Sequence, residues 1–298
     1  MLVDLLSIDS LTDGEIAEIL DRADEYFGGN RGRRSNERLH GKIVFNVFYE
    51  SSTRTAMSFA TAAHRLGASA IALSVEHSSV KKGETLEDTA RTLNAMRPDA
   101  LVIRHRENGA PAVVAEIMDA PVLNAGDGTN EHPTQALLDA ATLRHRLGRI
   151  DGLKIAICGD IRHSRVARSN ARLLPRLGAE VRLAGPPELM PDEIGARSVD
   201  EAISGADVVM MLRVQRERLE ADLGDGPGEY LSRYGLTSER LATASTDAVV
   251  MHPGPMNRDV EIESKIADDP DRSLITLQVE MGVAVRMACL ELVVSGGL

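Results

Sequence analysis

The stretch that most constrains this chain is a short apolar run followed at once by hydroxyl side chains and an arginine. Residues 43–48 read as a buried strand, and Ser52, Thr53, Arg54 and Thr55 follow it. Apolar residues from position 56 to 66 then recur at helical spacing. A helix that begins at this turn would offer free backbone N–H groups and the positive end of its dipole to an anion. The Arg54 guanidinium could bind a phosphate through two hydrogen bonds, so we predict a phosphate site here. The alternative is an ordinary Ser/Thr helix cap with a surface arginine.

Strand-like apolar runs alternate with helical periodicity along the whole chain. We expect strands at 43–48, 68–75, 99–103 and 121–124 in the first half, and at 155–158, 180–184, 207–212 and 248–251 in the second. This alternation predicts an α/β fold with two doubly wound parallel-sheet domains joined by helices. We place the first domain at 1–132 and the second at 133–279, with a final apolar helix, 280–298, packing back on the first domain. Residues 217–238 are polar and glycine-rich, and they predict a long flexible loop that could serve as a lid.

Composition argues against several classes of function. The net charge is −11 and aromatic residues are 3%, so neither a basic stripe nor a base-stacking platform for nucleic acid is expected. No apolar run reaches the roughly 20 residues that span a bilayer, and the acidic N-terminus is unlike a signal peptide. The two cysteines, Cys158 and Cys289, lie far apart in apolar patterns, which favours buried thiols and a reducing cytoplasm. No metal-ligand spacing and no G-x-G-x-x-G fingerprint is present, so we expect neither metal nor cofactor.

Polar groups follow several of the other expected strands, where ligands gather in open α/β sheets. Arg104 ends the strand at 99–103, and Pro133 fits the first position of a helix, which places His132 and Gln135 at another helix N-terminus. In the second half, Arg165, Arg213 and the segment 252–258 follow strands in the same way. Each of these residues alone could be a helix cap or a surface side chain.

Three phrases together resemble the aspartate and ornithine carbamoyltransferase family. They are Glu-Ser-Ser-Thr-Arg-Thr at 50–55, Ser-x-x-Lys-Lys-Gly-Glu-Thr at 78–85 and His-Pro-Thr-Gln at 132–135, in the order in which the family has them. The resemblance implies transfer of a carbamoyl group from carbamoyl phosphate to an amino acid. It implies that carbamoyl phosphate is bound by Ser52, Thr53, Arg54, Thr55, Ser78, Lys82, Arg104, His132, Gln135, Pro253 and Gly254, with Ser79 as the alternative to Ser78.

The charge of the acceptor can be matched to the residues of the second half. L-Aspartate carries two carboxylates, and Arg165 and Arg213 offer two cationic clamps, with Gln215 as a further contact. The resemblance implies that Lys82 also binds aspartate, in the site of the neighbouring subunit. Ornithine would need an acidic partner for its distal amine. Ornithine members of the family also usually carry His-Cys-Leu-Pro where residues 252–255 read His-Pro-Gly-Pro. Aspartate is therefore the expected acceptor, although Gly254 replaces the Leu of many aspartate members.

The expected reaction is attack of the neutral α-amine of aspartate on the carbamoyl carbon, followed by loss of phosphate. Thr55, Arg104 and His132 would stabilise the growing oxyanion, and Arg54 the leaving phosphate. The resemblance implies the second step of de novo pyrimidine synthesis, in a cytoplasmic homotrimer whose neighbouring subunits share sites through Ser78 and Lys82. A dihydroorotase or regulatory chain is a possible partner. The competing hypotheses are an ornithine enzyme, an inactive scaffold chain and a nucleotide-linked oxidoreductase.

Overall fold

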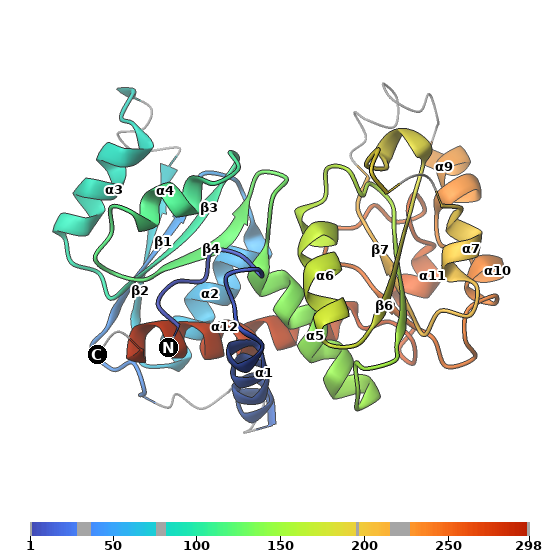
Figure 1. The fold of residues 1–298 in the computed structure, drawn as a ribbon, viewed down its shortest axis with the longest axis horizontal. Coiled ribbons are helices and arrows are strands. Elements are labelled where there is room, and N and C mark those ends of the chain that lie inside the picture. Colours follow the sequence, from blue (N-terminus) through green and yellow to red (C-terminus); the bar gives the residue numbers. More distant parts are fainter. Residues whose placement is uncertain (1, 29–36, 76–81, 195–196, 215–226, 297–298) are drawn as a thin grey trace. The chain divides into compact units, whose positions relative to one another are not determined.

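The structure is a computed structural model, and it describes residues 2–28, 37–75, 82–194, 197–214 and 227–296 (Figure 1). Contacts divide the chain into two compact units, Met1–Ala141 together with Val279–Leu298, and Thr142–Gln278. Two helices, α5 (Pro133–Leu147) and α12 (Ile275–Ser295), run from one unit into the other. The division by contacts therefore lies inside α5, whereas the sequence suggested a boundary after residue 132.

The first unit is built on a four-stranded parallel sheet in the order β2-β1-β3-β4. Its strands are β1 (Ile43–Phe48), β2 (Ser69–Ser74), β3 (Ala100–His105) and β4 (Val122–Asp127). Its other helices are α1 (Asp13–Gly28), α2 (Thr53–Arg65), α3 (Leu86–Ala95) and α4 (Ala110–Ala115). Because all four strands run in one direction, their carboxyl ends share one edge of the sheet. At that edge Phe48 pairs with Arg104, and His105 pairs with Asp127.

Local sequence signals explain where the helices of this unit begin. Before α1, the Thr12 backbone N–H donates to Glu15 Oε2 at 2.9 Å, and the Glu15 N–H donates to Thr12 Oγ1 at 3.2 Å. This reciprocal pair is the capping box, which satisfies two N–H groups that the helix leaves free. Thr85 caps α3 in a similar way by accepting from the Asp88 N–H. Apolar residues of β1 and β3 then pack against α3 and α4 to form the core.

The second unit repeats this plan with a parallel sheet in the order β6-β5-β7-β8. Its strands are β5 (Lys154–Cys158), β6 (Glu180–Ala184), β7 (Val208–Met211) and β8 (Val249–Met251). Its helices are α6 (Arg165–Arg176), the 3₁₀ turn η3 (Pro187–Leu189), α7 (Val199–Ile203), α9 (Pro227–Tyr234), α10 (Ser238–Leu241) and α11 (Ser264–Ala267). Side chains of α7, α10 and α11 close the core over β5, β7 and β8. The prediction of an α/β fold with two parallel sheets is confirmed.

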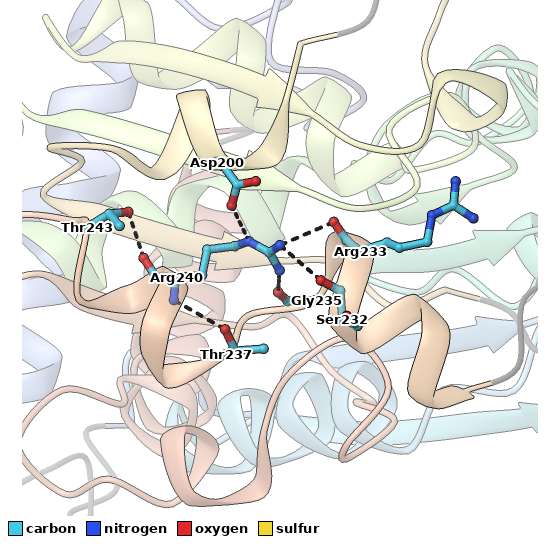
Figure 2. A network of polar contacts seen from close by, with 7 residues as sticks. All are labelled: Asp200, Ser232, Arg233, Gly235, Thr237, Arg240 and Thr243. Carbon is cyan, nitrogen blue, oxygen red and sulfur yellow. Dashed lines mark hydrogen bonds and ion pairs between the residues drawn. The ribbon is translucent and has the colours of Figure 1, made fainter.

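Helix α9 corrects the prediction of a continuous loop over 217–238. Tyr230 and Tyr234, one helical turn apart, pack with Leu189 and Val260 in a small apolar cluster, and this burial supports a helix where composition suggested a loop. Arg240 of α10 then closes the end of α9 by donating to backbone carbonyls there (Figure 2). The first part of the predicted loop lies outside the described residues.

Helix α12 is apolar on nearly all sides and is mostly buried, as the sequence predicts. From Val279 onward it belongs to the first unit. Near its end, Glu291 accepts hydrogen bonds from Tyr26 at 2.5 Å and Arg38 at 2.5 Å and pairs with Arg22 at 2.7 Å. The contacts with Tyr26 and Arg22 fasten α12 to α1, and Arg38 joins it to the segment before β1. None of the described helices is both long and apolar enough to cross a membrane.

Candidate active site

The predicted anion site lies at the N-terminus of α2, directly after β1. Ser52 is the N-cap residue, with extended backbone angles, and its side chain makes no capping hydrogen bond within the described chain. The first helical bond is donated by the Ala56 N–H to the Ser52 carbonyl at 3.0 Å, so the N–H groups of residues 53–55 precede the helical ladder. Thr53 and Arg54 are exposed and Thr55 is buried. Hydroxyls, amide dipoles and a guanidinium thus meet at one helix end, the arrangement that binds phosphate.

Arg104 stands beside this helix end, at the carboxyl edge of the same sheet. Its Nε lies 3.2 Å from Glu50 Oε2, and its Nη1 donates to the Ala125 carbonyl at 3.4 Å. Glu50 belongs to the turn that follows β1, so this ion pair ties Arg104 to the loop that leads into α2. Nearby, the rings of Tyr49 and His105 meet edge to face at 4.6 Å. Burial lowers the pKa of His105 and raises the pKa of Tyr49, so both stay uncharged beside the arginine near neutral pH.

Asp127 holds the turn between β4 and α5, where His132 lies. Its Oδ1 accepts from Asn124 Nδ2 at 2.9 Å and from the Glu131 N–H at 3.0 Å. Its Oδ2 accepts from the Gly109 N–H at 2.7 Å and from Asn130 Nδ2 at 3.1 Å. A single buried carboxylate therefore fixes the approach to His132, which is itself buried.

Gln135 lies in the first turn of α5, close behind His132. The Gln135 backbone N–H donates to the His132 carbonyl at 2.9 Å, and its side-chain Nε2 donates to Asp139 Oδ1 at 2.9 Å. In the first unit, then, the N-terminus of α2 and the His132 turn follow β1 and β4, and Arg104 lies at the carboxyl end of β3, which is between them in the sheet.

Arg165 opens α6 in the second unit, after β5. Ser164 caps this helix by accepting from the Ala167 N–H at 3.1 Å. Gly159 follows β5 with φ of +130°, and a Cβ atom there would lie 3.0 Å from the Leu212 carbonyl oxygen. Close packing between the ends of two strands therefore explains this glycine, and a nucleotide-binding role is not needed to explain it.

The turns after β7 and β8 are tied to each other. Arg213 is exposed and Val214, the next residue, is fully buried. The Val214 carbonyl accepts from Asn257 Nδ2 at 2.9 Å, which joins the segment that carries Arg213 to the segment after β8. Arg165, Arg213 and Gly254 thus follow the neighbouring strands β5, β7 and β8.

A buried histidine shapes the turn at Pro253 and Gly254. The Gly254 N–H donates to His252 Nδ1 at 2.9 Å, so Nδ1 is unprotonated and Nε2 carries the hydrogen that faces Glu261 Oε1 at 3.2 Å. Gly254 has φ of +66°, a left-handed conformation that favours glycine. Glycine at position 254, where many aspartate members of the family carry Leu, therefore suits this left-handed backbone conformation.

Some predicted residues stand apart from these groups. Ser78, its alternative Ser79, and Gln215 lie outside the described residues. Lys82 is exposed before α3. Asp127, Asp139, Asn257 and Glu261 were not predicted, although Asp127 and Asp139 flank the His-Pro-Thr-Gln phrase closely enough to have been noticed.

Comparisons with known proteins match both units of the chain. The family model of the aspartate/ornithine carbamoyltransferase carbamoyl-P binding domain matches residues 3–145, and that of the Asp/Orn binding domain matches residues 151–293. Aspartate carbamoyltransferase catalytic subunits of Rhizorhabdus wittichii and Novosphingobium aromaticivorans are 57% and 56% identical to the chain. These matches cover 96% and 97% of this chain and 93% and 88% of the relatives.

Solved structures extend the likeness to three dimensions. Aspartate transcarbamoylase from Trypanosoma cruzi in complex with carbamoyl phosphate matches with a TM-score of 0.88 and 32% identity, over 97% of this chain and 94% of that one. Ornithine carbamoyltransferase from Pyrococcus furiosus matches with a TM-score of 0.88 and 28% identity, over 98% of this chain and 97% of that one. The chain therefore belongs to the aspartate/ornithine carbamoyltransferase family.

Proposed function

We propose that this chain transfers the carbamoyl group of carbamoyl phosphate to the α-amine of L-aspartate, giving N-carbamoyl-L-aspartate and phosphate. The observation that carries the proposal is the N-terminus of α2, where Ser52–Thr55 present hydroxyls, free N–H groups and Arg54 one strand away from Arg104. The 56–57% identity to aspartate carbamoyltransferase catalytic subunits supports the same reaction.

The phosphate of the substrate would bind to Ser52, Thr53 and Arg54 at this helix end. An anion is stabilised there by the helix dipole and by charge-assisted hydrogen bonds from the guanidinium. Lys82, on the exposed segment before α3, would add a further positive charge. The same groups neutralise the phosphate as it leaves, and the departing phosphate can take the proton that the amine loses.

The carbamoyl carbonyl would be held by Thr55, Arg104 and His132. Negative charge grows on the carbonyl oxygen as the amine attacks, and donors fixed before the reaction stabilise that charge without having to reorganise. Glu50 fixes the guanidinium of Arg104, and Asp127 fixes the turn before His132. Loss of one such donor typically costs about 3–4 kcal/mol of transition-state stabilisation, or roughly 10²–10³ in rate. Gln135, Pro253 and Gly254 would contact the carbamoyl amide.

The acceptor is assigned by charge rather than by fold. The aspartate and ornithine relatives match the chain with the same TM-score of 0.88, so the fold is common to both acceptors. Arg165 and Arg213 supply two cations for the two carboxylates of aspartate, and Gln215 and Lys82 would add contacts. A relative from Trypanosoma cruzi has been solved with carbamoyl phosphate and aspartate together.

A purified sample assayed with carbamoyl phosphate and either aspartate or ornithine tests this function. We expect carbamoylation of aspartate alone. Arg165→Ala or Arg213→Ala should raise the KM for aspartate at least tenfold, because each removes one of two carboxylate clamps, and should leave the KM for carbamoyl phosphate near its wild-type value. Carbamoylation of ornithine would overturn the acceptor, and binding of carbamoyl phosphate without any turnover would favour a scaffold role.

We also propose a cytoplasmic homotrimer in pyrimidine synthesis, with Ser78 and Lys82 contributed to the neighbouring subunit's site. The relatives' name, catalytic subunit, supports an assembly of several chains, in which a dihydroorotase or regulatory chain could take part. Mixing Lys82→Ala with Arg54→Ala subunits tests the shared site, because a hybrid can contain one site with both native residues. Recovery of activity after subunit exchange supports sharing, and no recovery in proven hybrids contradicts it.

A further inference from the structure

The side chain of Gln135 is held by a buried carboxylate one turn further along α5. Gln135 is 8% exposed and Asp139 is 0% exposed. The Gln135 Nε2 donates to Asp139 Oδ1 at 2.9 Å. The two residues are four apart on the helix, the spacing at which side chains on one face meet.

The chemistry of the pair determines which end of the Gln135 amide faces Asp139. An ionised carboxylate can only accept hydrogen bonds, so it must face the NH₂ group of the amide. The carbonyl oxygen Oε1 then points away from Asp139 and keeps its capacity to accept. A neutral amide in place of Asp139 would lose this discrimination, since it could face either end of Gln135.

A buried arginine of α12 bonds to the same turn of α5. Arg286 of α12 is 4% exposed; its Nη1 donates to the Gly282 carbonyl at 3.2 Å and its Nη2 to Thr134 Oγ1 at 3.4 Å. Burial lowers the pKa of Arg286 to about 10, while the charges of Cys289 and Asp139 oppose that shift, so the guanidinium is positive at neutral pH. Thr134 lies between His132 and Gln135, so Arg286 also braces the turn that carries both.

We propose that Asp139 is a positioning residue that orients the Gln135 amide with Oε1 toward the carbamoyl NH₂, and that it thereby selects a carbamoyl group over an acyl group of the same size. The inference rests on the proposed binding of carbamoyl phosphate at this site. An acceptor placed for an N–H group disfavours a methyl group, because the buried oxygen is then left without a donor.

Binding of carbamoyl phosphate, acetyl phosphate and inorganic phosphate to the full chain tests the proposal. Acetyl phosphate carries a methyl group where carbamoyl phosphate carries NH₂. We expect the wild type to prefer carbamoyl phosphate by roughly tenfold or more. Asp139→Asn should reduce that preference by roughly tenfold while it leaves the Kd for inorganic phosphate within about twofold, since α2 is unchanged. Equal weakening of all three ligands would mean a structural role and would overturn the proposal.

Two further measurements keep the test decisive. In Gln135→Met, the preference for carbamoyl phosphate over acetyl phosphate should fall as it does in Asp139→Asn. The double variant should lose no more of this preference than either single variant, because the two residues act as a unit. A Gln135→Met protein that keeps the wild-type preference overturns the inference even if Asp139→Asn does not fold. Failure of the wild type to bind carbamoyl phosphate or to carbamoylate aspartate would instead overturn the proposed function, so the two failures are distinguishable.

Discussion

Arg240 is the side chain whose loss should most clearly loosen the second unit (Figure 2). Its Nη1 donates to the Gly235 carbonyl, and its Nη2 donates to the carbonyls of Ser232 at 3.1 Å and Arg233 at 3.3 Å. Its Nε lies 2.5 Å from Asp200 Oδ1 of α7. A positive group at the C-terminus of α9 thus satisfies carbonyls that the helix itself leaves without donors.

The exposed fractions decide how much each contact of Arg240 contributes. The Arg240 side chain is 10% exposed, so each of its three carbonyl bonds should contribute about 1 kcal/mol after exchange with water. The Asp200 side chain is 68% exposed, so the ion pair should add less than about 1 kcal/mol. Met in place of Arg keeps most of the aliphatic packing. We therefore expect Arg240→Met to lower the free energy of unfolding by about 3–4 kcal/mol.

Guanidinium unfolding followed by far-UV circular dichroism measures this loss, and amide hydrogen exchange over 228–234 localises it to α9. Asp200→Ala is the matched control, because it removes the ion pair alone and should cost at most about 1 kcal/mol. Helix α9 follows the segment that carries Arg213, so Arg240→Met should also raise the KM for aspartate more than that for carbamoyl phosphate. If Arg240→Met and Asp200→Ala cost the same, the carbonyl bonds contribute nothing and the reasoning is wrong.

Three further predictions follow from buried groups. Asp127→Ala should lower kcat for carbamoyl transfer by about tenfold or more, because the four hydrogen bonds that Asp127 accepts around the turn before His132 are lost. The affinity for inorganic phosphate, measured by titration, should stay unchanged. A parallel loss of phosphate binding would contradict this prediction. Burial raises the pKa of Cys158 and of Cys289 to about 12, so neither thiol should react with a disulfide reagent at pH 8 until the protein is unfolded, and a rapid native reaction would contradict their burial. Burial alone would raise the pKa of Glu291, but hydrogen bonds from Tyr26 and Arg38 and the pairing with Arg22 lower it below its ordinary 4.5. The stabilising contribution of the Glu291 carboxylate is therefore complete above pH 4.5 and is lost as the pH falls through the folded-state pKa. Glu291→Gln should make the free energy of unfolding depend less on pH in this acid range, and an unchanged pH dependence would refute the assignment.

Much of the fold could be predicted because its signals are local. Strand β1, the turn at Ser52 and helix α2 are specified by neighbours within a few positions, through a continuous buried apolar run, helical spacing and a closing glycine. The same is true of the capping box at Thr12 and Glu15. Residues 227–234 were predicted wrongly, because the helix depends on burial of Tyr230 against Leu189 and Val260, which are distant in the chain.

The sequence by itself determined the two parallel sheets, the strand-to-helix turns at their carboxyl ends and the family to which the chain belongs, since these depend on residues close together along the chain. Only the tertiary structure decided the partners of the polar side chains: Glu50 with Arg104, Asn257 with the Val214 carbonyl, and Arg286 bracing Thr134 across 152 positions. The physical reason is that a buried charge or amide bonds to whichever complementary group the fold brings within about 3 Å, and a pattern of neighbours carries no record of which segments will meet.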